Sequence, residues 1–359
     1  MPDTKSDAEQ VALALIEHFL KQNSFEGVES SNTSMVPASV PIPAGAQMAV
    51  GGFHGLSVRG VGYADGELVD PRCYVYVTRS TKKHEKLLPE RVGEVPVIMR
   101  KVGNLQIKPE IAASSSNGGH AYRFGGKVAC GGSIAPTGAQ YAGTLGAFLR
   151  DGSGDTYLLS NNHVIGACNH LPQGHPITAP SGIDAKVGSD PIVQVGALDR
   201  LYELRSGAHT YVPTQRTDAA LARVTDARSV SSMQGNWYDT PSTVSPPMAG
   251  MKVRKVGRTT GHTFGWVESK IPVLMPLPYK SKDFTATVNF AEVWVVVAPD
   301  DETFALPGDS GSLVVNEDAS AAVGLLFACS PDGKRGIITS LPEVLSDIGQ
   351  GFSLLSGLR

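Results

Sequence analysis

Short apolar runs bounded by turn residues recur in the first third of the chain. Three of them, residues 56–62, 73–78 and 95–102, are typical of strands. Residues 81–88, between the second and third runs, are expected to form a helix. This pattern predicts a small α+β unit over residues 55–112.

The region before this unit has helical spacing instead. Apolar side chains stand at positions 12, 15, 16, 19 and 20, and Ser6 or Asp7 stands where a helix cap is expected. We expect an amphipathic helix here that packs on a neighbouring domain or on a second subunit. Residues 26–48 are rich in Ser, Pro, Ala and Gly, which predicts a linker or an extended arm and gives a first segment over residues 1–54.

From residue 120 to the end, strand-like runs alternate with turns. A low-complexity stretch, residues 112–119, precedes them and is expected to be a connector. The 359 residues include 40 Gly and 24 Pro without a collagen-like period, which fits many short strands joined by tight turns. The expected fold class is mainly β, with residues 120–359 as the largest domain.

Charge and cysteine content narrow the class of function. A formal net charge of -3 and a pI near 6.3 give no electrostatic reason to expect a nucleic acid or a membrane as partner. No run approaches the ~20 apolar residues that cross a bilayer, and the N-terminus lacks a signal-peptide pattern. The four widely spaced cysteines form no metal-binding motif. We expect a cytoplasmic protein with reduced thiols, no metal and no other cofactor.

The strongest chemical signal is a serine held between glycines, Ser310 in the run Pro-Gly-Asp-Ser-Gly-Ser. Glycine on either side lets the chain turn sharply and aim backbone N–H groups at a developing oxyanion. His163 ends a strand-like run and is a candidate general base, and Asp218 directly precedes another apolar strand and is placed to orient it. Each residue alone also fits a structural role. The order His163, Asp218, Ser310 is that of chymotrypsin-type enzymes.

Two further segments match in the same order. Residues 256–267 are similar to the Gly-x-Thr-[Ser/Thr]-Gly strand pair of bacterial trypsin-like enzymes, and residues 322–327 resemble the strand after the nucleophile. The chain thus resembles the trypsin/chymotrypsin-like serine peptidases. Through residues 143–146, the Asn-Asn-His163-Val turn and residues 324–328, it more closely resembles intracellular bacterial trypsin-like proteins and the plant NARROW LEAF group.

The resemblance implies a double Greek-key β-barrel with the triad His163, Asp218 and Ser310 in the crevice between the barrels, the first barrel being abbreviated. It implies an oxyanion hole made of the N–H groups of Gly308 and Ser310. It also implies a C-terminal helix, residues 342–348 with 354–355, that packs on the second barrel.

The resemblance also places the base of the primary substrate pocket at Phe304 and its walls at Phe327, Ala328 and Cys329. None of these is acidic, so a small or apolar residue before the scissile bond is expected. Two alternatives stay open. In the first, an acidic side chain reaches the pocket and selects Lys or Arg; the candidates are Asp300, Asp301 and Glu302. In the second, His262 and Arg258 offer positive charge to an acidic substrate. The simplest interpretation of His262 and Arg258 is that of exposed strand-turn residues.

These features predict a serine endopeptidase that acts on a protein or peptide through an acyl-enzyme. Self-association through the terminal helices is left open. Two alternatives remain: a silent or latent scaffold that keeps the peptidase fold, and an esterase that uses the same triad. Latency would follow if Phe304 and Phe327 simply fill core space and close the pocket.

Overall fold

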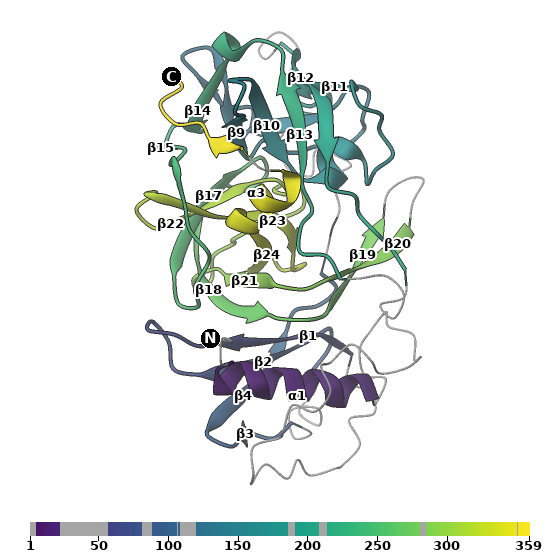
Figure 1. Cartoon of the computed structure of the whole chain (residues 1–359), viewed down its shortest axis with the longest axis vertical. Coiled ribbons are helices and arrows are strands. Elements are labelled where there is room, and N and C mark those ends of the chain that lie inside the picture. The colour runs from purple at the N-terminus through teal and green to yellow at the C-terminus, as the bar shows by residue number, and fades with distance from the viewer. Residues whose placement is uncertain are drawn as a thin grey trace.

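The computed structural model describes residues 5–21, 57–80, 88–105, 107, 120–185, 191–207, 214–280, 285–349 and 351–359. Three tiers follow one another along the molecule's long axis: an open sheet, a closed barrel and a layer that contains α1 (Asp7–Lys21) (Figure 1). The expected linker over 26–48, the connector over 112–119 and nearly all of the helix expected over 81–88 lie outside the described residues.

The middle tier is a closed barrel of six strands. The strand that begins it, β17, pairs with both β22 and β18, so the path of strands returns to its start. In barrel order the strands are β17 (Lys252–Gly257), β22 (Leu313–Asn316), β23 (Ala321–Cys329), β24 (Arg335–Ser340), β21 (Val293–Val297) and β18 (Gly261–Ile271). The two-residue strand β16 (Thr243–Val244) pairs with β23 outside this path. Every residue of β23 is buried.

The sheet of the closed barrel continues into the N-terminal unit. Tyr63 pairs with Lys270 of β18, and this joins four further strands to the barrel: β1 (Val58–Ala64), β2 (Arg72–Val77), β4 (Val95–Lys101) and β3 (Arg91–Val92). The predicted strands of this unit are confirmed, within one or two residues at each end.

The predicted N-terminal helix is confirmed as α1, and Ser6 Oγ accepts the N–H of Glu9 at its start. Its apolar stripe packs on β1, β2 and β4 and shares one core cluster with them; buried helix members are Ala8, Val11, Ala12, Leu15, Ile16 and Phe19. Each large apolar side chain buried in this way contributes about 1.5–3 kcal/mol. The helix therefore packs on the neighbouring α+β unit, one of the two arrangements that its pattern predicted.

The first barrel is an open sheet of eight strands. In sheet order these are β25 (Ser353–Leu354), β9 (Ala147–Arg150), β10 (Thr156–Ser160), β13 (Ala220–Val224), β12 (Val193–Leu201), β11 (Pro176–Ala179), β7 (Ser133–Pro136) and β8 (Gly143–Thr144). A smaller sheet contains β15 (Tyr238–Asp239), β14 (Val230–Gln234), β6 (Lys127–Cys130) and β5 (Arg123–Phe124). The short helix η2 (Ala227–Ser229) precedes β14.

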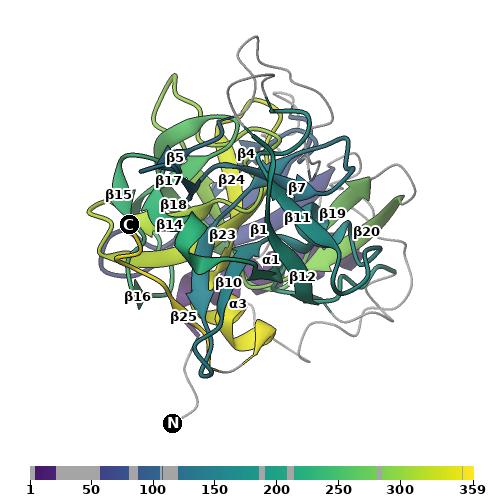
Figure 2. The same cartoon turned by 90° about the horizontal axis from the view of Figure 1, so that it is seen from above.

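A separate hairpin, β19 (Met275–Lys280) and β20 (Thr285–Phe290), lies at one side of the molecule, seen down the long axis in Figure 2. It follows β18 of the closed barrel and is bridged to residues 206 and 215 of the first barrel. The hairpin therefore links the two barrels beside the chain that leads to Asp218.

The C-terminal segment differs in part from expectation. Helix α3 (Leu341–Ile348) packs on β23 and β24 of the closed barrel, as predicted. The helix ends at Ile348, before Gly349, whose φ of +126° lies outside the helical range, and Leu354 instead pairs with Leu149 of β9. The expectation that residues 354–355 belong with the helix is wrong, because they cover an edge of the first barrel's sheet.

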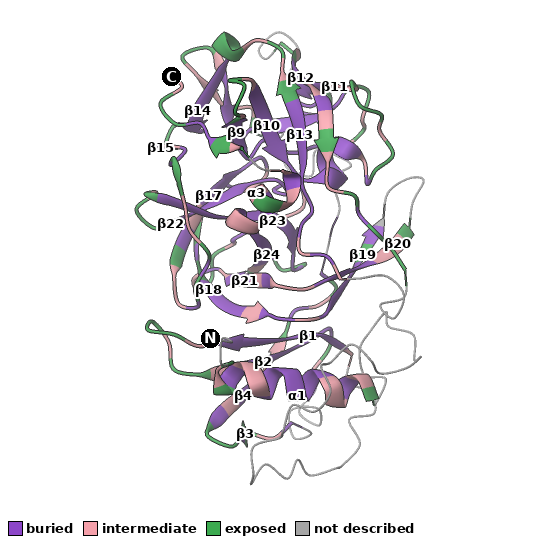
Figure 3. Ribbon diagram, viewed as in Figure 1, coloured by how far each residue is buried: buried purple, intermediate pink, exposed green. Residues whose placement is uncertain are grey.

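The predicted mainly β class, with two barrel-type units, a small α+β region and terminal helices, is confirmed. The strands of both barrels are largely buried, and exposure concentrates in the loops (Figure 3). In the described part of the chain no helix combines the length and the apolarity needed to span a membrane.

Candidate active site

His163 lies directly after the buried strand β10, in the one-turn π-helix η1 (Asn162–Gly166). The two asparagines before it are tied to the surrounding chain. Asn161 Nδ2 donates to the carbonyl of Asp218 at 2.6 Å, and Asn162 Nδ2 donates to the carbonyl of Tyr202 at 2.7 Å. The turn that carries the imidazole is thus fixed by side-chain hydrogen bonds.

Asp218 reaches His163 because β13, the strand that begins two residues after it, pairs with β10, the strand that ends before the histidine. Ala220 of β13 lies opposite Ser160 of β10. Asp218 Oδ2 lies 2.6 Å from His163 Nδ1, and Oδ1 accepts the backbone N–H of His163 at 3.2 Å. Both side chains are almost fully buried. An ionised carboxylate only accepts, so it holds the proton on Nδ1 and leaves Nε2 as an acceptor.

A tyrosine that the sequence analysis did not identify also contacts this carboxylate. Tyr279 of β19 donates its hydroxyl to Asp218 Oδ2 at 2.8 Å, and its ring meets that of His163 edge to face at 5.9 Å between centroids. Burial first, and the negative charge of Asp218 second, raise the pKa of Tyr279 well above its usual value, so the phenol stays protonated.

Ser310 lies in a tight loop before β22, with positive φ at Gly308 (+94°) and Gly311 (+95°). Its Oγ donates to the carbonyl of Phe327 at 3.4 Å, a long bond. Within the described residues His163 Nε2 has no hydrogen-bond partner. The structure therefore brings His163 and Asp218 into direct contact, whereas it records no hydrogen bond between Ser310 and His163.

Two peptide groups of this loop, Pro307–Gly308 and Asp309–Ser310, are held through their carbonyl oxygens. The carbonyl of Pro307 accepts from Thr259 Oγ1 at 2.8 Å, and the carbonyl of Asp309 accepts from Ser312 Oγ at 2.6 Å. In a trans peptide the N–H points away from the carbonyl of the same unit. Across the described chain no hydrogen-bond acceptor is found for the N–H groups of Gly308 and Ser310.

The side chain of Asp309 organises this loop. Its Oδ1 accepts the backbone N–H groups of Thr259 and Thr260, at 2.8 and 3.1 Å. Its Oδ2 accepts the Thr260 hydroxyl at 2.7 Å and the N–H of Leu306 at 2.9 Å. Lys255 Nζ lies 3.4 Å from the same oxygen. Burial lowers the pKa of Lys255, and the charge of Asp309 opposes that shift.

The four residues predicted to form the substrate pocket are all buried. Phe304 lies among the interior side chains of the closed barrel, and Phe327 packs against Phe290 at 4.7 Å between ring centroids. Ala328 and Cys329 are 2% and 4% exposed. Asp300, Asp301 and Glu302 are instead exposed. The pocket assignment stays a prediction, and both aromatic rings belong to core clusters.

Arg258 fits neither of its two sequence interpretations, an exposed turn residue or a positive charge offered to an acidic substrate. It is 2% exposed, and its Nε donates to Asp184 Oδ2 at 2.8 Å. The expectation of an exposed turn residue is therefore wrong, because a buried carboxylate neutralises this guanidinium. His262 is half-buried, and burial together with Arg254 and Lys255 lowers its pKa to about 4. A neutral imidazole offers no positive charge to an acidic substrate near pH 7.

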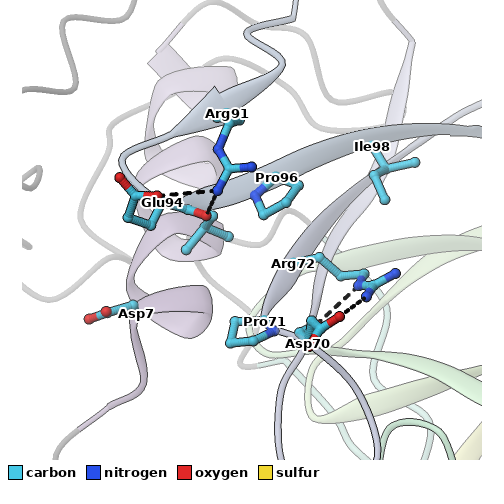
Figure 4. Close-up of a pocket in the computed structure, with 9 residues that line it drawn as sticks. Asp7, Asp70, Pro71, Arg72, Arg91, Glu94, Pro96 and Ile98 are labelled. Carbon is cyan, nitrogen blue, oxygen red and sulfur yellow. Dashed lines mark hydrogen bonds and ion pairs between the residues drawn. The ribbon is translucent and has the colours of Figure 1, made fainter.

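Other parts of the described chain show no competing centre. No cluster of potential metal ligands occurs there, and the buried residues Cys73, Cys130, Cys168 and Cys329 form no disulfide. A hollow of about 490 Å³ lies in the N-terminal unit between the start of α1, β2 and the β3–β4 turn (Figure 4). Its arginines, Arg72 and Arg91, already contact Asp70 and Glu94.

Solved serine proteases have a similar fold. Thermobifida fusca protease A is 20% identical over 64% of this chain and 100% of its own, with a TM-score of 0.41. Nocardiopsis protease is 18% identical over 63% and 97%, and Cellulomonas bogoriensis chymotrypsin is 14% identical over 64% and 99%, each with a TM-score of 0.40. Searches of protein-family models and of curated proteins found no match.

The structural neighbours are proteases, and the predicted resemblance to chymotrypsin-like serine peptidases is found again at the level of fold. The resemblance to the intracellular bacterial and NARROW LEAF groups stays a prediction. At these identities and TM-scores, the roles of individual residues have to be argued from the contacts within this chain.

Proposed function

We propose that this protein is a serine endopeptidase with His163 as general base, Asp218 as its orienting carboxylate and Ser310 as nucleophile. The observation that carries the proposal is the buried contact of 2.6 Å between Asp218 Oδ2 and His163 Nδ1, with Nε2 unpartnered among the described residues. That arrangement leaves a basic nitrogen available for a serine proton.

In the proposed reaction, Ser310 Oγ leaves its long bond to the Phe327 carbonyl and donates to His163 Nε2. Hydrogen bonds between catalytic groups are often long in a free enzyme and tighten when substrate binds. As the Oγ attacks the peptide carbonyl, its proton passes to Nε2, and the imidazolium is stabilised by ionised Asp218. The same proton then goes to the leaving amine, and water hydrolyses the acyl-enzyme.

The N–H groups of Gly308 and Ser310 are proposed to form the oxyanion hole. Their own peptide units are held by Thr259 and Ser312, so the two donors need no reorientation during the reaction. Loss of one such donor typically costs about 3 kcal/mol in the transition state. Asp309 and Lys255 support this loop and do not take part in proton transfer.

The substrate is proposed to be a protein or peptide with a small or apolar residue before the scissile bond. Phe304, Phe327, Ala328 and Cys329 carry no charge, and the acidic residues at 300–302 are exposed. We also propose that the chain is divided into an N-terminal helix with its linker, a small α+β unit and a peptidase domain, over residues 1–54, 55–112 and 120–359. The proposed location is cytoplasmic. No cofactor is required for this chemistry.

A latent form of the same enzyme is the second candidate. Ser310 is only 6% exposed, its Oγ faces the Phe327 carbonyl, and Phe304 and Phe327 are fully buried. A substrate could then bind only after the chain around these rings had rearranged. Proteolytic cleavage or the binding of a partner would trigger that rearrangement. Activity that is equal with and without residues 1–112 would argue against control by the N-terminal region.

The test is intact-mass spectrometry after exposure to a fluorophosphonate. We expect a single adduct on Ser310 that is lost in Ser310→Ala and in His163→Ala, and kept in Ser153→Ala, an exposed turn serine. Labelling that appears only after limited proteolysis would select latency, and no labelling in either state would leave a silent scaffold. Digestion of an unstructured protein then separates a peptidase from an esterase.

A further inference from the structure

We propose that Tyr279 is a positioning residue of this site, which holds the Asp218 carboxylate in the orientation that serves His163. The inference rests on the proposed function and adds a fourth side chain to it. Three donors meet this carboxylate: the Nδ1 and the backbone N–H of His163, and the Tyr279 hydroxyl. Two of them share Oδ2, at 2.6 and 2.8 Å.

The direction of the hydrogen bond follows from the chemistry of the neighbours. The titratable side chains that face the carboxylate in the described chain are His163 from η1, Cys168 from the following turn and Tyr279 from β19. Burial and Asp218 raise the pKa of Cys168 to about 12, so the thiol is neutral. From α3, Asp347 contacts the preceding residue, Thr217. With an ionised Asp218, Tyr279 acts as a donor.

The hairpin fixes the tyrosine in place from both barrels. Tyr279 lies opposite Ala286 in the hairpin, and its ring stacks on Phe290 at 6.2 Å between centroids. Phe290 is bridged to Gln215, three residues before Asp218, and Gln215 donates its N–H to the Asn289 carbonyl at 2.8 Å. These backbone contacts therefore tie the hairpin that carries Tyr279 to the chain that leads to Asp218.

The hairpin also contacts the N-terminal region. Ile107 pairs with Tyr279 in a parallel bridge, and the Ile107 side chain is buried in the same core cluster. The strand that carries the tyrosine thus lies between the N-terminal region and the carboxylate. A rigid donor in this place restricts rotation of the carboxylate, as expected of a positioning residue.

The matched pair of variants is Tyr279→Phe and Tyr141→Phe. Tyr141 Oη donates to the Val164 carbonyl at 3.1 Å, so the control also removes one hydroxyl from the turn that carries His163, without touching Asp218. In Tyr279→Phe we expect kcat/KM to fall about 10-fold, mostly in kcat, because a donor to a charged group is lost. In Tyr141→Phe we expect a change of less than about 2-fold.

The pH dependence separates positioning from packing. The hydroxyl proton is the positive end of a dipole that faces the Asp218 carboxylate and partly offsets its charge. Without the hydroxyl, the carboxylate attracts the His163 imidazolium more strongly. The imidazolium then persists to higher pH. In Tyr279→Phe we expect the acidic limb of the kcat/KM profile, and the midpoint of the His163 titration followed by NMR, to move to higher pH. The signal is assigned from its loss in His163→Ala.

A double-mutant cycle gives a second readout. In an Asp218→Asn background the Tyr279→Phe change should alter kcat/KM by less than about 2-fold, because the acceptor has lost its charge. An unchanged titration midpoint in Tyr279→Phe, or an equal loss of activity in both backgrounds, would overturn the proposal. Because the NMR titration needs no turnover, it decides the role of Tyr279 even if the wild-type protein fails to react with a fluorophosphonate and the proposed function falls.

Discussion

Lys255 Nζ lies 3.4 Å from Asp309 Oδ2, and both side chains are fully buried. The lysine comes from β17 of the closed barrel, and the aspartate directly precedes Ser310 in the chain. Four further hydrogen bonds from backbone and hydroxyl donors reach the same carboxylate. The shape of the loop around the proposed nucleophile therefore depends on a buried ion pair within the barrel.

Removal of the cation should be costly. In Lys255→Met the Asp309 charge stays buried without its counter-ion, and loss of one partner from a buried pair typically costs about 3–5 kcal/mol. We expect urea unfolding to show a loss of this size and the fluorophosphonate reaction to slow. The double variant Lys255→Met with Asp309→Asn removes the stranded charge and should recover part of the stability. Equal stability of the two variants would contradict this account.

Thr259 should matter for rate more than for binding. Its hydroxyl holds the Pro307 carbonyl and so orients the N–H of Gly308. In Thr259→Val we expect kcat to fall about 10-fold, part of the ~3 kcal/mol that one oxyanion donor supplies, with KM little changed. Thr263→Val is the control, because Thr263 donates to the Phe304 carbonyl at the same distance of 2.8 Å, before the loop. An equal fall of kcat in the two variants would contradict a specific role of Thr259, because it would show that loss of either threonine hydroxyl disturbs the loop as a whole.

Position 311 requires a glycine for two reasons, the lack of space for a side chain and the backbone conformation. Its φ is +95°, and a Cβ at this position would lie 2.3 Å from both Ser160 Oγ and the Thr144 carbonyl oxygen. The Thr144 oxygen belongs to the backbone and cannot rotate away. In Gly311→Ala we expect a stability loss of at least about 2 kcal/mol by thermal unfolding. Gly152→Ala, where a Cβ would meet nothing within 4 Å, should change stability by less than about 0.5 kcal/mol.

Local sequence predicted the elements whose structure depends on neighbouring residues in the chain. The strands around the site are short apolar runs, such as β10 and β13, and each is followed or preceded by the polar residue that points into the site. Local sequence predicted that His163 and Asp218 each stand at the end of a strand. Their contact depends on the pairing of β10 with β13, and it was expected from the chymotrypsin-type order of the residues and not from the local pattern. Helix α1 was predictable from local sequence, since its apolar positions follow helical spacing and Ser6 or Asp7 stands where a cap is expected.

Contacts between residues far apart in the sequence could not be predicted from local patterns. Tyr279 is 61 residues from Asp218, and nothing in the Pro-Leu-Pro-Tyr run around it distinguishes it from a core tyrosine. Arg258 has the sequence context of an exposed turn, and only Asp184, 74 residues away, explains its burial. The pairing of β1 with β18 likewise joins segments that no local pattern relates. Each depends on which strands become neighbours, which is a property of the whole fold.

Stability below neutral pH should depend on His262. Its imidazole is half-buried beside Trp237 and Phe264, its Nε2 has no partner within the described chain, and burial first, with Arg254 and Lys255 next, lowers its pKa from 6.5 to about 4. Between these two values the unfolded chain binds a proton that the folded chain excludes, so stability falls as the pH is lowered from about 6.5 to about 4.

Replacement by a ring that cannot titrate tests this directly. In His262→Phe the melting temperature should fall less steeply over that pH range, because the aromatic packing is kept and the proton uptake of the unfolded chain is lost. His18 in α1 also has a lowered pKa, from burial and from Lys21, so some slope should remain. His18→Phe combined with His262→Phe should flatten it further. Parallel pH curves for the wild-type protein and His262→Phe would show that the imidazole is no less basic in the folded protein than in the unfolded chain.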